Sequence, residues 1–200
     1  MDAIGLRERK KLRTREALAA AALRLFAERG YDQTTVEDIA AAADVSPRTF
    51  FRYFTSKEDA IFAEDEERSG LLSEALRPGS ADEPVQVAVR RAVLALVEHQ
   101  TSGTDGLGRV RLVTRVPALV AWSLEHQARY EETVAQAVAE RLHADPNRDV
   151  RARIVAGAAF GALRAAMRAW AASDGEIDPV EAAGRALDVL DEGFDRALGS

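Results

Sequence analysis

The side chains best suited to chemistry gather in one short segment, VSPRTFFRYFTSKED, which runs from Val45 to Asp59. Phe50 and Phe54 are four residues apart and share one face of a helix, so this face is predicted to be buried. The other side chains point away from it: Arg48, Thr49, Phe51, Arg52 and Tyr53. Guanidinium groups donate in pairs to guanine, methyl groups and ring edges contact thymine, and hydroxyls bind phosphate. The segment therefore predicts a helix that reads the major groove of DNA.

The composition is that of a globular protein with a core of its own. The chain has 200 residues, of which 47% are hydrophobic and 30% charged, and it contains no cysteine. Disulfides and thiolate metal sites are therefore excluded. There is no signal-peptide pattern and no run of eighteen uncharged apolar residues. We expect a cytoplasmic protein with no membrane partner.

The charges are distributed unevenly along the chain. The net charge of −6 by itself argues against nucleic-acid binding. However, residues 1–58 hold eleven basic and nine acidic side chains, whereas residues 59–200 hold 16 basic and 24 acidic ones. Six of the basic residues lie between Arg7 and Arg15. A cationic front on an anionic body orients a protein towards a polyanion, and this run is expected to contact phosphates or the minor groove.

The elements around the segment form a helix-turn-helix pattern. A first helix is expected over Leu6–Arg29 and is followed by Gly30. Thr34 and Glu37 fit a capping box at the start of a second helix that ends near Ala43. Ser46 is a good N-cap and Pro47 suits the first helical position of a third helix, which is expected to end around Phe54–Thr55. Two short helices joined by a tight turn and braced by a longer one bind DNA in many proteins.

The rest of the chain predicts further helices and no strands, so the fold class is all-α with about nine to ten helices. The expected domains are a DNA-binding domain over residues 1–56 and a larger helical domain over 57–200. Turn residues separate the predicted helices. Their approximate ranges are Lys57–Leu76, Glu83–Gln100, Leu107–Arg115, Pro117–His143, Arg148–Ala172 and a last helix from Pro179 to near Leu198.

The segment ALRLFAERGYDQTTVEDIAAAADVSPRTFFRYFTSKEDAIF resembles the DNA-binding domain of TetR-type transcriptional regulators, with a close match over residues 10–65. The resemblance implies that Thr35 contacts a phosphate and that Arg48, Thr49 and Arg52 face bases. It also implies that Phe51, Tyr53 and Lys57 lie along the DNA backbone. Ser46 is expected among the DNA-binding residues as well. The family often has tyrosine in place of Phe51, so a hydroxyl-to-phosphate bond is missing here.

The body of the chain is similar to a TetR subgroup that includes the mycofactocin-system regulator, in the segments Arg109–Leu119 and Gly161–Trp170. That similarity implies an apolar slot for an acyl-CoA-like ligand, with cationic groups at its mouth. The candidate cations are Arg111, Arg115, Arg164 and Arg168, and the candidate apolar residues are Leu119, Trp122, Phe160 and Met167. The alternative is that these arginines pair with surface carboxylates and the large side chains are ordinary core.

The last two predicted helices suggest a homodimer. Ile154, Gly161 and Ala165 share one stripe of the first, and small residues allow helices to approach closely. Leu187, Leu190 and Phe194 give the last helix an apolar side. In TetR-type proteins these helices form a four-helix interface with a second subunit. Two-fold symmetry also suits a protein that reads a palindromic operator.

Catalysis is not expected, and neither is a cofactor or a metal ion. The three histidines lie in different predicted helices, and the sequence has no Gly-rich phosphate loop. Glu140 and His143 match a Glu-x-x-His pattern, but di-iron bundles need two such motifs. The leading hypothesis is a ligand-responsive repressor. A small-molecule-binding helical dimer with a vestigial DNA head and a ligand-indifferent architectural DNA binder remain alternatives.

Overall fold

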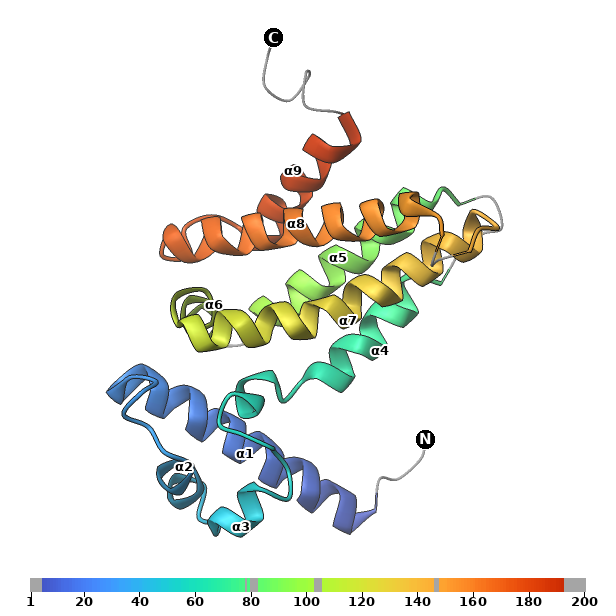
Figure 1. Ribbon diagram of the computed structural model, residues 1–200. Coiled ribbons are helices and arrows are strands. Elements are labelled where there is room, and N and C mark those ends of the chain that lie inside the picture. The colour runs from blue at the N-terminus through green and yellow to red at the C-terminus, as the bar shows by residue number, and fades with distance from the viewer. Residues whose placement is uncertain (1–4, 78, 80–82, 103–105, 146–147, 193–200) are drawn as a thin grey trace.

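The computed structural model describes residues 5–77, 79, 83–102, 106–145 and 148–192, and over these ranges it holds nine α-helices, one short 3-10 helix and no strand (Figure 1). This confirms the all-α fold class. The elements are α1 (Leu6–Arg29), α2 (Val36–Ala42), α3 (Pro47–Phe50), the 3-10 helix η1 (Asp59–Phe62), α4 (Asp65–Ala75), α5 (Val85–Thr101), α6 (Gly106–Arg115), α7 (Pro117–Arg141), α8 (Val150–Ala172) and α9 (Pro179–Glu192).

The start of α2 differs from the sequence prediction by one residue. Thr35, not Thr34, is the N-cap: its hydroxyl accepts from the Asp38 backbone N–H, and the Asp38 carboxylate accepts from the Thr35 N–H. Thr34 is buried, and its hydroxyl donates to the carbonyls of Gly30 and Leu25. The capping box therefore exists, but burial of Thr34 moves it to the next threonine and its partner.

The third helix is shorter than expected. Ser46 caps it and Pro47 occupies its first position, as predicted, but the α-helix ends at Phe50. The backbone then tightens, because the N–H groups of Arg52 and Tyr53 donate to carbonyls three residues back. Phe54 N–H still reaches Phe50 O at 3.0 Å. Both phenylalanines therefore stay on the buried side although regular helix has ended.

The single helix predicted from Lys57 to Leu76 is divided in two. η1 ends at Phe62, and α4 begins at Asp65 after the turn at Ala63 and Glu64. The reason lies in the two parts' different partners. Ala60, Ile61 and Phe62 are buried with α1–α3, whereas Leu72 and Leu76 are buried in the body.

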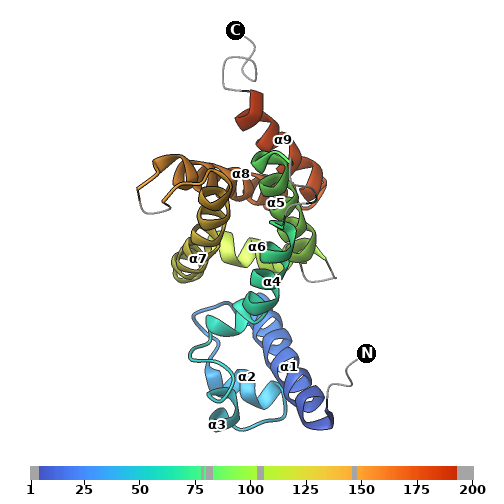
Figure 2. The same ribbon diagram turned by 90° about the vertical axis from the view of Figure 1, so that its right-hand side faces the viewer.

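The hydrophobic residues form two clusters. The N-terminal cluster joins buried residues of α1, α2, α3 and η1, and it includes one residue of α7, Leu119. The second cluster, which we call the body, joins α4 through α9. Figures 1 and 2 show α1–α3 at one end of the molecule, α8 and α9 at the opposite end, and α4 running between them.

The remaining helices agree with the prediction within a few residues. The predicted end of the last helix near Leu198, and its Phe194, lie outside the described residues. Leu187 is buried in the body of its own chain, while Leu190 remains 38% exposed. Within the ranges given above, none of the helices combines the length and apolarity needed to cross a lipid bilayer.

Candidate nucleic-acid interface and effector site

Phe50 and Phe54 fix the orientation of α3. Phe50 is fully buried and Phe54 is 2% exposed, and their ring centroids are 5.5 Å apart. At the other end, the Ser46 hydroxyl accepts from the Thr49 N–H at 3.2 Å and lies 3.0 Å from the Thr49 hydroxyl. The opposite face of α3 and the turn after it are therefore held towards solvent.

That outer face carries the side chains that the sequence singled out. Arg48 and Arg52 are exposed, and no carboxylate among the described side chains lies within 4.0 Å of either. The Arg52 guanidinium lies 5.0 Å from the centre of the Tyr53 ring and donates to its hydroxyl at 3.3 Å. Phe51 is 57% exposed. Two exposed guanidinium groups beside flat rings suit contact with base edges and phosphates.

Two further predicted contacts already have partners within the chain. The exposed Thr35 hydroxyl donates to Asp38 Oδ2 at 2.8 Å as part of the cap. The Lys57 ammonium donates to the carbonyls of Tyr31 at 2.8 Å and Thr34 at 3.0 Å. Both residues thus organise the entrance to α2, and their phosphate contacts stay predictions.

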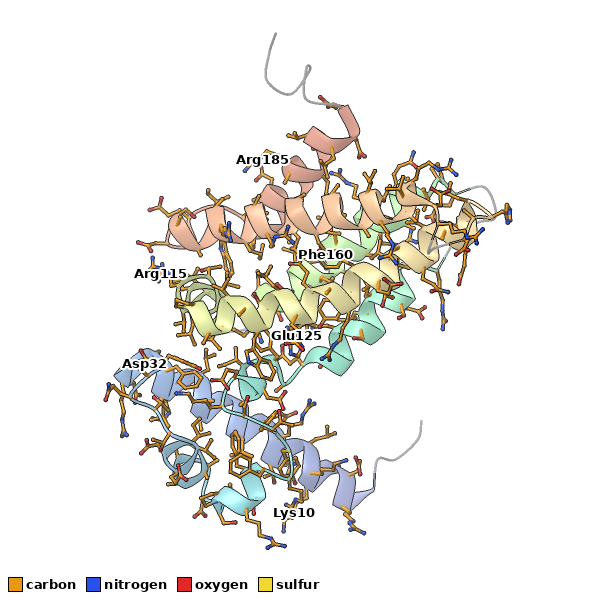
Figure 3. The ribbon with its side chains drawn as sticks, viewed as in Figure 1. Lys10, Asp32, Arg115, Glu125, Phe160 and Arg185 are labelled. Carbon is orange, nitrogen blue, oxygen red and sulfur yellow. The ribbon has the colours of Figure 1, made fainter. Side chains whose placement is uncertain are left out.

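The basic start of α1 lies on the same side of the molecule as α3. Arg7, Arg9, Lys10, Lys11 and Arg13 are exposed. Arg15 connects the two elements, since its guanidinium lies 5.7 Å from the centre of the Phe54 ring. Figure 3 shows Lys10 at the same end of the molecule as α3. Basic side chains therefore extend from the start of α1 to Arg15 beside α3, although Lys11 pairs with Glu8 at 3.4 Å. This distribution suits a polyanion.

A cavity of about 140 Å³ lies between η1 and the body helices α4, α5, α6, α7 and α8. Four of the predicted ligand residues line it, namely Phe160, Arg164, Met167 and Arg168. Phe160 lies between α7 and α8 in Figure 3. Apolar side chains of α6 and α8 make up much of the wall, including Val110, Val113 and Leu163. The arrangement suits an amphipathic small molecule.

The other four predicted ligand residues lie away from this cavity. Arg111 pairs with Asp174, and the exposed Arg115 lies at the outer edge of the body (Figure 3). Leu119 is fully buried in the N-terminal cluster. The Trp122 ring stacks on Phe62, with centroids 6.4 Å apart. Leu119 and Trp122 therefore join the body to the DNA-binding helices.

Sequence reasoning missed several polar residues of the cavity wall: Arg68, Gln100, Arg109, His126 and Tyr130. Arg68 and His126 are buried, at 5% and 7% exposure. These residues belong to four different helices, so no local spacing connects them. One feature of the sequence could have indicated them: an arginine or histidine that occurs where the helical periodicity calls for an apolar residue.

Two family models match the chain: the tetR family of bacterial regulatory proteins over residues 18–63, and the MftR C-terminal domain over residues 83–195. The second match alone covers more than half of the chain. This chain belongs to the TetR family of transcriptional regulators. Regulators of this family bind DNA operators and act as dimers. The resemblance seen in the sequence, including that to the mycofactocin-system subgroup, is confirmed.

Individual relatives agree with this TetR-family assignment. The chain is 39% identical to the HTH-type transcriptional regulator TcmR of Streptomyces glaucescens over 83% of this chain and 76% of that protein. It is 31% identical to a Mycobacterium tuberculosis protein named MftR, for mycofactocin biosynthesis transcriptional regulator, over 94% of both chains. A crystal structure of Thermus thermophilus FadR, a TetR-family repressor in complex with lauroyl-CoA, is similar with a TM-score of 0.58 and 25% identity, covering 90% of this chain and 94% of that one.

Proposed function

We propose that this TetR-family regulator is a homodimeric repressor that binds a palindromic operator and is released by a small effector in the body cavity. Residues 1–56 would form the DNA-binding domain and residues 57–200 the effector-binding and dimerisation domain, with η1 (Asp59–Phe62) packed against the DNA-binding helices. The observation that carries the proposal is the orientation of α3. Phe50 and Phe54 are buried, while Arg48 and Arg52 face solvent with no counter-charge among the described side chains.

The roles of the individual residues follow from this orientation. Arg48, Thr49 and Arg52 would contact bases, and Ser46, Phe51 and Tyr53 would lie along the DNA backbone. Thr35 and Lys57 would add phosphate contacts from the entrance to α2. Phe51 offers a ring and no hydroxyl, so it would pack against backbone sugars and would not bond a phosphate.

An amphipathic effector is supported by the apolar cavity with Arg164 and Arg168 on its wall. An acyl-CoA-like molecule is the form suggested by the similarity to the FadR complex with lauroyl-CoA. Release requires that the effector bind the two orientations of the DNA-binding helices with different affinity. A difference of about 1–3 kcal/mol is typical of such coupling.

Selection from a random DNA library tests the proposal. The wild-type protein should enrich a palindromic sequence whose half-sites lie about one helical turn, or a multiple of it, apart. Arg48→Ala and Arg52→Ala should each lose about 1–3 kcal/mol of binding free energy and relax the preference at single base pairs. Arg115→Ala, an exposed arginine at the far edge of the body, is the matched control. Failure to enrich any sequence at moderate salt would favour a helical dimer with a vestigial DNA head.

A further inference from the structure

Glu64 lies where the chain passes from the N-terminal cluster to the body. It forms the turn between η1 and α4 together with Ala63. Its Oε2 atom accepts from Arg109 Nη1 at 2.7 Å and from Arg68 Nη2 at 3.3 Å, and His99 Nε2 lies 3.5 Å away. These partners belong to α6, α4 and α5. One carboxylate thus connects the turn that follows the DNA-binding helices to three helices of the body.

Glu64 is held in its charged form. Burial by itself would raise the pKa of this carboxyl, but Arg109, Arg68 and His99 together outweigh burial and keep the pKa below its ordinary value. The carboxylate is therefore an anion at neutral pH. Any other anion that binds the same guanidinium groups must compete with it.

Arg109 faces two separate spaces. It lines the effector cavity together with Arg68 and Gln100. It also lines a groove beside α1, and Glu64 lines that groove but not the cavity. A ligand in the cavity therefore reaches Arg109 without passing Glu64. Arg109 Nη2 donates to Gln100 O at 2.8 Å, a bond that keeps the guanidinium in place when its carboxylate partner changes.

The inner end of the cavity is cationic and its walls are apolar. Arg68 is 5% exposed and the Arg109 side chain 15%, whereas the Arg164 side chain is 38% exposed. Phe160, Leu163 and Met167 lie on the wall as well. A plain acyl chain that entered methyl-first would place a hydrocarbon end against buried guanidinium groups. A carboxylate would instead accept charge-assisted hydrogen bonds there.

We propose that the effector is an amphipathic carboxylic acid whose carboxylate binds Arg109 and Arg68 in place of Glu64. Glu64 then no longer holds the turn that leads to the DNA-binding helices against the body. This inference rests on the proposed function, because it names the ligand class of the same cavity, and it replaces the acyl-CoA-like form of the effector with a free acid. Exchange of one carboxylate for another leaves the ion pairing nearly unchanged. Burial of the effector's apolar body then supplies the binding free energy, and the released turn transmits the signal.

The test compares three probes on the full-length wild-type protein bound to its selected DNA. Sodium decanoate, methyl decanoate and decanoyl-CoA are titrated while DNA release is followed by fluorescence anisotropy. Decanoate should release DNA at a concentration at least about tenfold lower than its ester does, because the ester lacks the charge that pairs with arginine. Equal potency of acid and ester overturns the inference. Release by decanoyl-CoA but not by decanoate also overturns it, yet leaves the proposed function standing.

A variant tests the competition directly. Glu64→Gln removes the competing charge, so it should bind decanoate about three- to tenfold more tightly by calorimetry and bind DNA more weakly. Glu67→Gln, an exposed acidic neighbour in the same groove, is the matched control and should behave as wild type. Unchanged decanoate affinity in Glu64→Gln contradicts the exchange. If Glu64→Gln binds decanoate more tightly than the wild type does, but the wild type selects no DNA sequence, the repressor proposal fails and the carboxylate subsite stands.

Discussion

Lys57 serves the fold at a position where the sequence suggests a DNA contact. Its ammonium donates to two backbone carbonyls of the connector between α1 and α2 and lies 4.1 Å from the centre of the Tyr31 ring. The Tyr31 hydroxyl donates to the carboxylate of Glu58, which follows Lys57 in the chain. Burial and the charge of Glu58 raise the pKa of Tyr31 well above its ordinary value, so the tyrosine remains a donor. At the residue scale, Lys57 and Glu58 together fasten the connector that places α2.

Lys57→Met should therefore lower stability as well as DNA affinity. Loss of two charge-assisted hydrogen bonds should reduce the free energy of unfolding by about 1–3 kcal/mol, measured by urea denaturation. Lys10→Met, which removes an exposed charge of α1, should leave stability unchanged and reduce the salt slope of DNA binding by roughly one unit. If Lys57→Met changes only the salt slope, phosphate binding and not the fold is the main role of Lys57.

At the element scale, α7 belongs to both hydrophobic clusters. Leu119 is buried in the N-terminal cluster, and Val134 and Val138 are buried in the body. Between them, His126 stacks on Phe62 of η1 with ring centroids 4.8 Å apart and on Trp122 at 5.4 Å. Movement of α6 or α7 around an effector would therefore displace η1 as well. This stack is a second contact, besides Glu64, through which the cavity reaches the DNA-binding helices.

Acid should weaken this junction. Burial lowers the pKa of His126, Arg129 lowers it further, and Asp59 only partly opposes them. Because the unfolded chain binds this proton more readily, the stabilisation is complete above about pH 6.5 and is lost as pH falls through the lowered pKa. Urea denaturation at a series of pH values should show this loss in the wild type and in His143→Gln, an exposed control. If the free energy of unfolding of His126→Phe falls with pH as it does in the wild type, the loss of stability in acid belongs to other groups.

At the scale of the whole molecule, the end opposite α3 carries exposed apolar side chains, and we propose the dimer interface there. Val150 is 63% and Ile154 60% exposed on α8, and Val189 and Leu190 are partly exposed on α9. Gly157 and Gly161 on α8 leave room for close approach of another helix, since no backbone of the described residues outside α8 lies near the place of a Cβ atom. A two-fold axis at this end would set the spacing of two α3 helices on DNA.

Ile154→Glu should convert the dimer to monomer. A charge buried in an apolar interface should raise the dissociation constant at least about tenfold, as sedimentation velocity at micromolar concentration can measure. DNA affinity should fall with it, because a single half-site remains in contact. Leu12→Glu, an exposed apolar residue of α1, should leave the dimer intact. A dimeric Ile154→Glu protein would place the interface elsewhere.

Local sequence determined most of the helices and the buried face of α3. Periodic apolar residues, Gly30, the Ser46–Pro47 start and the Phe50–Phe54 spacing act over a few residues, so they can be recognised without a structure. Tertiary packing decided the rest. It buried Thr34 and moved the capping box, and it divided the helix after Lys57 between two clusters. It also brought Glu64, Arg68, His99 and Arg109 together from a turn and three helices. Partly buried charges need counter-charges, and these come from distant parts of the chain, so no regular spacing in the sequence predicts the cluster.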